Sequence, residues 1–412
     1  MARRSGAGRG DPAAGWLGGL TAALLATTAA QALATLTVFA LPVLAPIVAP
    51  DLGVAPHWIG WQVAAVYLAA SATSMLSAGA LRRHGSARCT QLALAAAALA
   101  CLLVPLAGLP GALIGAALTG FGYGLTNPAA TEVLARLAPA RRRNMVFAVK
   151  QTGVPIGGAL AGLLLPSLAQ ALGWRGALLA LAALLLLAVF AAGLFHRPWA
   201  AERETGPGPP RGAGGGWRAL REQPGMAGLA AISGLYSGFQ LALGSMTVAM
   251  LVEEAGWSPV AAGLVAAVTQ AVGAAARLFW GAVADRWRDG MRTLALIGAI
   301  TLAGGVLLPG IPGWPPAAVI ALFALLGGSA AGWNGVLMAE AARLAAPGRA
   351  GEATGGVLAV AFAGVVVGPS LLGLLVGAVG SYAFAFAVLA GLPALGALIA
   401  WRGRARRRPQ DR

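Results

Sequence analysis

The chain has 412 residues, of which 58% are hydrophobic and only 10% are charged, whereas ordinary soluble domains have about 25% charged residues. Together with a mean hydropathy of +0.77, this excludes a soluble globular protein, because the surface of such a protein needs polar residues. The net charge of +16 would suggest nucleic-acid binding in a soluble chain. Here the basic residues lie between apolar runs, so we expect no nucleic-acid partner.

Apolar runs long enough to cross a bilayer, about 20 residues each, recur along the whole chain. The first run, 16–41, contains no charge and exceeds the roughly 7–15 residues of a signal-peptide core, so we expect a retained helix. The sequence predicts an all-α integral membrane protein with twelve spans, at about 16–41, 58–81, 89–108, 112–136, 145–171, 176–195, 226–251, 259–284, 291–308, 316–342, 353–377 and 382–401.

The basic residues of the tails and loops are divided unequally between the two sides of this arrangement. Twenty-six fall on the side of the N-terminus and one, Arg175, on the other. Because cytoplasmic loops carry the excess of arginine and lysine, we expect both termini in the cytoplasm. Arginine supplies 28 of the 29 basic residues, and with the many Ala and Gly this suggests a GC-rich bacterial genome. We therefore expect a bacterial inner membrane.

The stretch 196–225 interrupts the apolar pattern with dense Gly and Pro, which are typical of a flexible linker. It would divide the chain into two six-helix bundles, 1–195 and 226–412. Distinctive residues recur in the two halves at offsets of 203 to 209: Arg83 and Arg286, Glu132 and Glu340, Arg141 and Arg349, and Gln31 and Gln240. Duplicated halves are a transporter architecture with the solute site near the midplane.

The residues after the eighth span read Gly281-Ala282-Val283-Ala284-Asp285-Arg286-Trp287-Arg288. This run resembles the cytoplasmic G-x-x-x-D-R-x-G-R-R signature of the major facilitator superfamily, with Arg288 in place of the later glycine. The resemblance covers nearly the whole chain. It implies a monomeric secondary transporter that works by alternating access on a small solute, with or without a coupling ion, and without a cofactor or metal.

The resemblance also implies a latch at the cytoplasmic end, built from Gly281 and the residues repeated around it. Asp285 would reach the positive start of the fifth span, Arg286 would pair with Glu340, and Arg83 with Glu132. Arg141 and Arg349 follow those glutamates by nine residues. The first-half copy has Arg82 in the aspartate position, and an arginine cannot cap the positive start of the eleventh span.

In this family the first, fourth, seventh and tenth helices line the central cavity. Each carries an amide near its middle here: Gln31, Asn127, Gln240 and Asn334. They are candidates for solute contact, and hydrogen bonds between helices are the alternative. Arg277, about 12 Å from Asp285 along its helix, and Lys150 with its neighbour Gln151 add charge and polarity at depth. Such charges indicate function, and their positive sign favours an organic or inorganic anion.

Two alternatives stay open at this point. Pro155-Ile156-Gly157-Gly158 resembles the antiporter signature G-P-x-x-G-G but is one residue short, so efflux of drugs or metabolites by antiport is possible, as is simple helix packing. A membrane-embedded enzyme is a remote alternative. It would need a catalytic or metal-binding cluster, and His57, His84 and His196 fall in separate loops.

Overall fold

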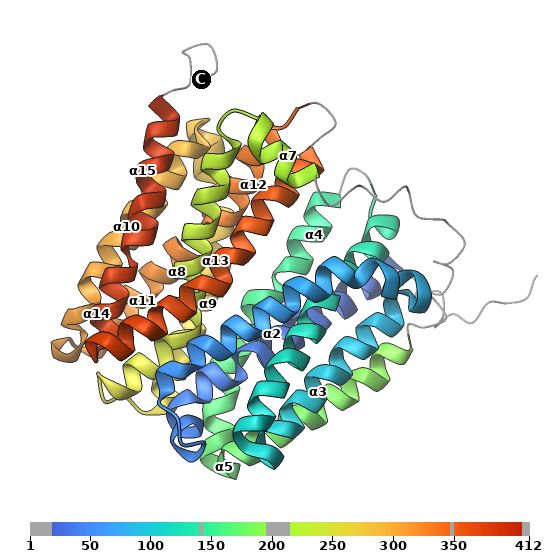
Figure 1. Ribbon diagram of the computed structural model, residues 1–412, viewed down its shortest axis with the longest axis vertical. Helices are drawn as coiled ribbons and strands as arrows, with labels where there is room; N and C mark the ends of the chain where they lie inside the picture. Colours follow the sequence, from blue (N-terminus) through green and yellow to red (C-terminus); the bar gives the residue numbers. More distant parts are fainter. Residues whose placement is uncertain (1–18, 140–142, 195–214, 347–349, 406–412) are drawn as a thin grey trace, which may run out of the picture.

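A computed structural model describes residues 19–139, 143–194, 215–346 and 350–405. Within these ranges the chain forms helices joined by short turns, without strands. Figure 1 shows the helices gathered into two bundles, one from each half of the chain. The all-α membrane fold predicted from the apolar runs is confirmed.

The first half consists of α2 (Leu20–Asp51), the 3₁₀-helix η1 (Pro56–Trp58), α3 (Ile59–Leu137), α4 (Arg143–Gln151) and α5 (Gly153–Gly193). The 79 residues of α3 make three crossings, because the backbone reverses at Gly85 and Gly108, with φ of 76° and 59°. Gly173, with φ of 71°, divides α5 in the same way. Positive φ is accessible to glycine without strain. With α2, and with α4 leading into α5, this half crosses six times.

The second half begins with α7 (Gly215–Glu222), which lies inside the segment predicted to be a linker; residues 195–214 of that segment lie outside the described ranges. Six crossings follow: α8 (Met226–Glu253), α9 (Pro259–Trp287), α10 (Gly290–Leu307) with η4 (Leu308–Gly313), α11 (Pro316–Ala330) with α12 (Trp333–Leu344), α13 (Ala350–Val379), and α14 (Tyr382–Leu389) with α15 (Gly391–Ala405).

Nine stretches of the described chain are long and apolar enough to span a membrane. Two of them hold two crossings each, divided at Gly108 and Gly173, and residues 59–84 supply one more. This gives the twelve crossings that the sequence predicts. The bounds of the first were wrong: α2 continues through Pro42, Pro46 and Pro50. Prolines break isolated helices, but neighbouring helices satisfy the freed carbonyls inside a bundle.

The two ends of the bundles differ in charge. We call the end with the α3 turn at Arg83 and the α9 terminus at Arg286 the basic end. The opposite end, with Asp51, His57 and Glu254, is the acidic end. In Figure 1 the basic end is at the top, near α7 and α4, and the acidic end is at the bottom.

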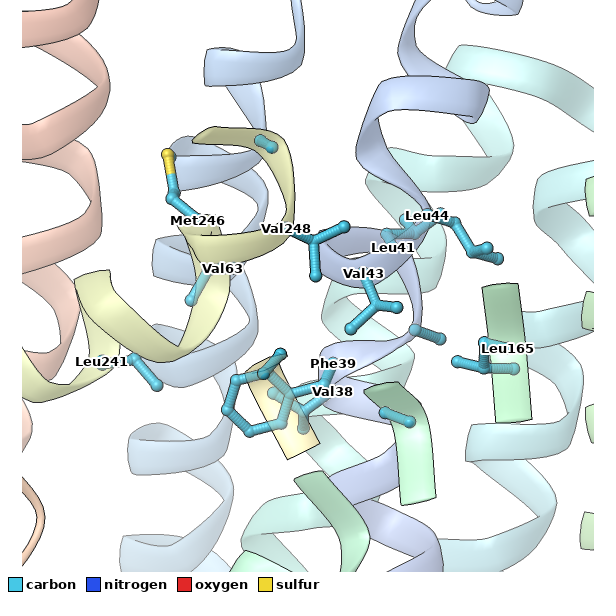
Figure 2. Packing of buried hydrophobic residues seen from close by; sticks show 14 of the residues in the cluster. Val38, Phe39, Leu41, Val43, Leu44, Val63, Leu165, Leu241, Met246 and Val248 are labelled. Carbon is cyan, nitrogen blue, oxygen red and sulfur yellow. The ribbon is translucent and has the colours of Figure 1, made fainter. Parts of the chain in front are cut away.

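One hydrophobic core joins both bundles toward the acidic end. Phe39 and Leu44 of α2 and Leu165 of α5 belong to the same buried cluster as Met246 and Val248 of α8, and Figure 2 shows these side chains lying between the helices. Toward the basic end the cores are separate. One contains Val133, Leu134 and Val146 of the first half, and another contains Leu229, Trp280, Trp333 and Val357 of the second. The structure is therefore closed at the acidic end.

Glycines allow the bundles to approach backbone to backbone at this closed end. A Cβ at Gly162 of α5 would overlap the carbonyl oxygen of Gly263 of α9, and the reverse also holds. A Cβ at Gly60 of α3 would overlap the carbonyl oxygen of Pro369 of α13. Small residues permit such close crossings, so these two interfaces hold the halves together.

Candidate functional site

The first bundle contains a buried polar cluster centred on Lys150, which is only 2% exposed. Its Nζ donates hydrogen bonds to Gln31 Oε1 at 2.9 Å, to Gln151 Oε1 at 3.3 Å and to Asn127 Oδ1. These acceptors come from α2, α4 and α3. Lys150 therefore links the first, fourth and fifth crossings, and the structure brings together four residues that the sequence could name only one by one.

Two threonines surround Gln31 in this cluster. Gln31 Nε2 donates to Thr35 Oγ1 at 3.4 Å, and the Thr35 hydroxyl donates to the Gln31 carbonyl oxygen at 2.9 Å. The Thr126 hydroxyl donates to the Tyr123 carbonyl oxygen at 2.7 Å and lies 3.3 Å from Gln31 Oε1. A Cβ at Gly153 would lie 2.9 Å from the Gln31 Cβ, so the glycine at the start of α5 lets that helix pack closely on α2. Sequence reasoning missed both threonines. Their positions, four residues after Gln31 and directly before Asn127, were the available signal.

The second bundle uses its related amides differently. Gln240 Oε1 accepts a hydrogen bond from Trp333 Nε1 at 3.0 Å, and the Trp333 ring packs edge-on against Tyr236 with centroids 6.1 Å apart. Asn334 is half-buried and has no hydrogen bond to another described residue. Gln240 thus forms a hydrogen bond between helices, which was the alternative to solute contact. The Asn334 amide keeps a donor and an acceptor that could bind a solute.

Arg277 of α9 is half-buried and is held by one nitrogen. Its Nε donates to the carbonyl oxygen of Ala331 at 3.2 Å. That region supplies carbonyl acceptors because the tenth crossing is interrupted between α11 and α12; Trp280 Nε1 likewise donates to Gly328 at 2.8 Å. The terminal nitrogens of Arg277 have no hydrogen bond to a described residue.

Arg277 and Lys150 lie at the same depth on facing bundles. Helices α5 and α9 run antiparallel, with Gly162 against Gly263 and Gly158 against Gln270. Arg277 is seven residues beyond Gln270 (270 + 7 = 277), and Gln151 is seven before Gly158 (158 − 7 = 151), so Arg277 faces the level of Gln151 and its neighbour Lys150. Both cations lie on the basic side of the interface between α5 and α9.

The predicted latch residues all lie at the basic end where they are described. Asp285 and Arg286 are exposed at the end of α9, just beyond Gly281. Glu340 of α12 is 7% exposed and its carboxylate pairs with Arg343 at 2.9 Å; no Arg286–Glu340 pair occurs among the described residues. Arg83 is exposed and Glu132 is half-buried. Arg141 and Arg349 lie outside the described residues.

The acidic end has a repeated clamp that sequence reasoning missed. Asp51, at the end of α2, accepts a hydrogen bond from Trp174 Nε1 at 2.7 Å and lies 3.8 Å from Arg175. Glu254, directly after α8, accepts from the backbone nitrogens of Tyr382 and Ala383 at the start of α14. In each half an acid at the end of the first crossing holds the start of the sixth crossing. The 203-residue offset between the two acids was the available signal.

Comparison with known proteins shows to which family this arrangement of helices belongs. The profile of the Major Facilitator Superfamily matches residues 27–355 and 238–412. No curated protein sequence matches the chain. Among solved structures, the chain is similar to a bacterial homologue of the human lysosomal transporter Spinster. The inward-facing, occupied form aligns with a TM-score of 0.72, 16% identity, and coverage of 95% of this chain and 98% of that one.

The inward-facing, unoccupied form of the same homologue aligns with a TM-score of 0.70, 15% identity and 96% coverage of both chains. At this identity the likeness shows the fold, and the family profile, which spans more than half of the chain, shows the family. The protein is therefore a membrane transporter of the Major Facilitator Superfamily and not an enzyme.

Proposed function

We propose that this transporter moves a small anion across a bacterial inner membrane by alternating access, with Arg277 and Lys150 binding the anion between the bundles. One observation carries the proposal: the two cations come from different bundles and lie at the same depth, and neither forms an ion pair with a described carboxylate. A charge at the membrane centre costs at least about 2.5 kcal/mol. A bound anion offsets this cost for both groups at once.

The contacts of Arg277 support the anion. Its Nε is anchored to Ala331, which fixes the guanidinium while leaving the terminal N–H groups to bind a planar oxyanion by two bonds. Asn334 offers its amide at the first turn of α12 in the same bundle. Gln31, Asn127 and Gln151 hold the Lys150 ammonium, whose positive charge attracts the anion, and Gln240 holds Trp333 in place.

The proposed orientation puts the basic end in the cytoplasm, following the distribution of arginine. The structure is then inward-facing, with the exit at the acidic end closed by the glycine contacts. Closure of the basic end would bring Asp285 to the start of α4 and engage the latch. In this proposal the bundles 1–195 and 226–412 rock as two bodies of one monomer, connected by the 196–225 segment.

Uptake into proteoliposomes of a panel of radiolabelled organic and inorganic anions, with amino acids and amphipathic drugs as comparison, tests the function. For the anion that is taken up, Arg277→Lys should retain partial transport and Arg277→Gln should lose binding while remaining folded. Arg292→Gln is the matched control, since Arg292 is exposed at the basic end and stacks on Trp287. Unchanged binding in Arg277→Gln, or a cationic solute, would overturn the proposal.

A further inference from the structure

We propose that Lys150 exchanges a proton during the transport cycle, being a neutral amine in the empty site and an ammonium when the anion is bound. The transporter would thereby move its anion together with a proton. The coupling to an anion rests on the proposed function above, whereas the proton exchange itself is a property of the Lys150 cluster.

The first observation is that, among the described residues, every hydrogen-bond partner of Lys150 is a neutral amide: Gln31, Asn127 and Gln151. An ammonium has three N–H donors, and three amide oxygens satisfy it. A neutral amine has two donors and a lone pair, so one partner must turn its NH₂ group toward Nζ. Amides carry both an acceptor and donors and can reverse, whereas a carboxylate would hold the ammonium only.

Gln151 is the partner suited to reverse. Its bond to Nζ is 3.3 Å long and its side chain is exposed. Gln31 is fully buried, and Thr35 bonds both to its side-chain amide and to its carbonyl oxygen. The cluster therefore has a rigid part that holds Nζ in place and a mobile part that adapts to its charge. It can serve both protonation states without unsatisfied buried polar atoms.

The second observation comes from composition. Lys150 is the one lysine of the chain, beside 28 arginines. Arginine stays protonated in proteins, whereas lysine releases its proton readily when it is removed from water. A group needed only for fixed charge could have been arginine, as Arg277 is at the same depth. The chain instead has its lysine at the basic position that three amides enclose. At this position a charge that can be gained and lost would serve the transport cycle.

The titratable groups on the surrounding helices leave Lys150 as the exchanging group. On α2 the one such group is Asp51, and on α5 it is Arg175, both at the acidic end. On α3 the nearest are Tyr67 and Tyr123, which pack against each other, and Glu132, five residues beyond Asn127 toward the basic end. On α9 the nearest is Arg277, and α4 begins at Arg143. None of these is a hydrogen-bond partner of Nζ.

The exchange is a proton transfer between water and the Nζ atom of Lys150. A hydronium ion entering from the basic end gives its proton to the Nζ lone pair and leaves as water, and the ammonium then attracts the anion. On the other side, departure of the anion leaves a buried ammonium without a counter-charge, and its proton passes to water, which leaves as hydronium. One proton and one negative charge cross together.

Because the chain has a single lysine, ¹⁵Nζ-lysine labelling reports on Lys150 alone, and NMR separates amine from ammonium without any solute. We expect the amine signal in the purified, solute-free protein at about pH 8, where an ordinary lysine is fully protonated, and the ammonium signal on acidification. Gln151→Glu should restore the ammonium at the same pH, because its carboxylate would lie beside Nζ. Arg292→Lys adds an exposed lysine as an internal reference and should show an ammonium signal.

An ammonium signal from Lys150 at about pH 8 in the wild type, matching that of the Arg292→Lys reference, would overturn the proposal, as would an amine signal that acidification leaves unchanged. Both outcomes are read on folded protein and are independent of the transport assay. An anion-uptake screen can therefore fail while proton exchange stands, and the reverse is equally distinguishable.

Discussion

Replacing Gly162 with alanine should shift the transporter from the state closed at the acidic end to the state open there. Gly162 packs on Gly263 across the two bundles, and an added Cβ would overlap the Gly263 carbonyl oxygen. It would also lie 3.2 Å from the Ala267 nitrogen and 3.4 Å from the Gly263 carbonyl carbon. All three atoms belong to the backbone, so no rotamer change relieves the overlap.

The size of the effect follows from this geometry. Ordinary contacts between heavy atoms lie at about 3.5–4.0 Å, so the bundles would have to part by roughly 1 Å at this point. Overpacking of this kind costs about 1–3 kcal/mol. The penalty applies only to the conformation in which α5 and α9 touch here, so the equilibrium should shift by about 5- to 150-fold.

Thiol labelling measures the shift. His57 packs at the acidic end against Gly373 and Gly377 of α13, so a His57→Cys thiol should react faster with a membrane-impermeant maleimide when this end opens. The native Cys89 and Cys101 are 0% and 3% exposed, which keeps the background low. We expect labelling in the Gly162→Ala background to be at least about fivefold faster.

Gly157→Ala is the matched control. Its Cβ would overlap the carbonyl oxygen of Ala32 in the same bundle, so it should lower the melting temperature without favouring either conformation. Gly355→Ala, where nothing lies within 4 Å, should change neither quantity appreciably. Equal labelling rates in Gly162→Ala and the parent, or an equal acceleration by Gly157→Ala, would refute the claim that this contact belongs to one state of the cycle.

Three further predictions concern the two ends of the molecule. Glu254→Gln removes a charged acceptor from the start of α14 and should cost about 1 kcal/mol, seen as a melting temperature lower by about 1–3 °C; no change would show that the clamp is unimportant. Asp285→Asn should slow initial uptake about fivefold by weakening the helix-dipole contact of the latch, and far more than Arg82→Asp; equal losses would contradict this. Reporter fusions after His57 and after Arg349 should report opposite sides of the membrane, and same-side readings would contradict the topology.

The number of crossings could be predicted because it depends on the length and charge of apolar runs, which the sequence displays directly. The interruptions within crossings could not. The tenth crossing breaks between Ala330 and Trp333 inside one uniform apolar stretch, because neighbouring helices and the Arg277 and Trp280 side chains supply the partners. Helix α7 could not be predicted either. It has only eight residues, and it begins in a run of glycines whose composition predicts a flexible chain.

The site residues were identifiable for a similar reason. Gln31, Asn127 and Lys150 stand out because polar groups are expensive in a membrane, and the rise per residue gives their depth. That all three meet around one ammonium depends on the rotation of α2, α3 and α4 about their axes, which spacing along the chain does not fix. The predicted pairing of Arg286 with Glu340 rested on resemblance, and among the described residues the structure pairs Glu340 with Arg343 instead of Arg286.

The two halves repeat each other in the close backbone contacts between the bundles, but they do not repeat the two charged residues Lys150 and Arg277. The Gly162–Gly263 contact of α5 with α9 has its counterpart in the contact of Pro369 with Gly60, where α13 meets α3, at offsets of 207 (369 − 162) and 203 (263 − 60). The offset of 203 residues relates Arg277 to Ser74 in the first half (277 − 203). The offset of 208 residues, which also relates Arg141 to Arg349, relates Lys150 to Leu358 in the second half (150 + 208).

Arg277 of α9, and Lys150 three residues before α5, therefore stand beside one of two symmetry-related interfaces, and the related positions beside the other hold a serine and a leucine. Packing alone demands small residues at both interfaces and charge beside neither. Since each intramembrane charge is costly, the placing of both charges on the side of α5 and α9 indicates a specific use. An anion bound there would lie off the pseudo-symmetry axis, in contact with the two helices that must slide past each other when the acidic end opens. The solute would in this way be bound at the interface whose movement releases it.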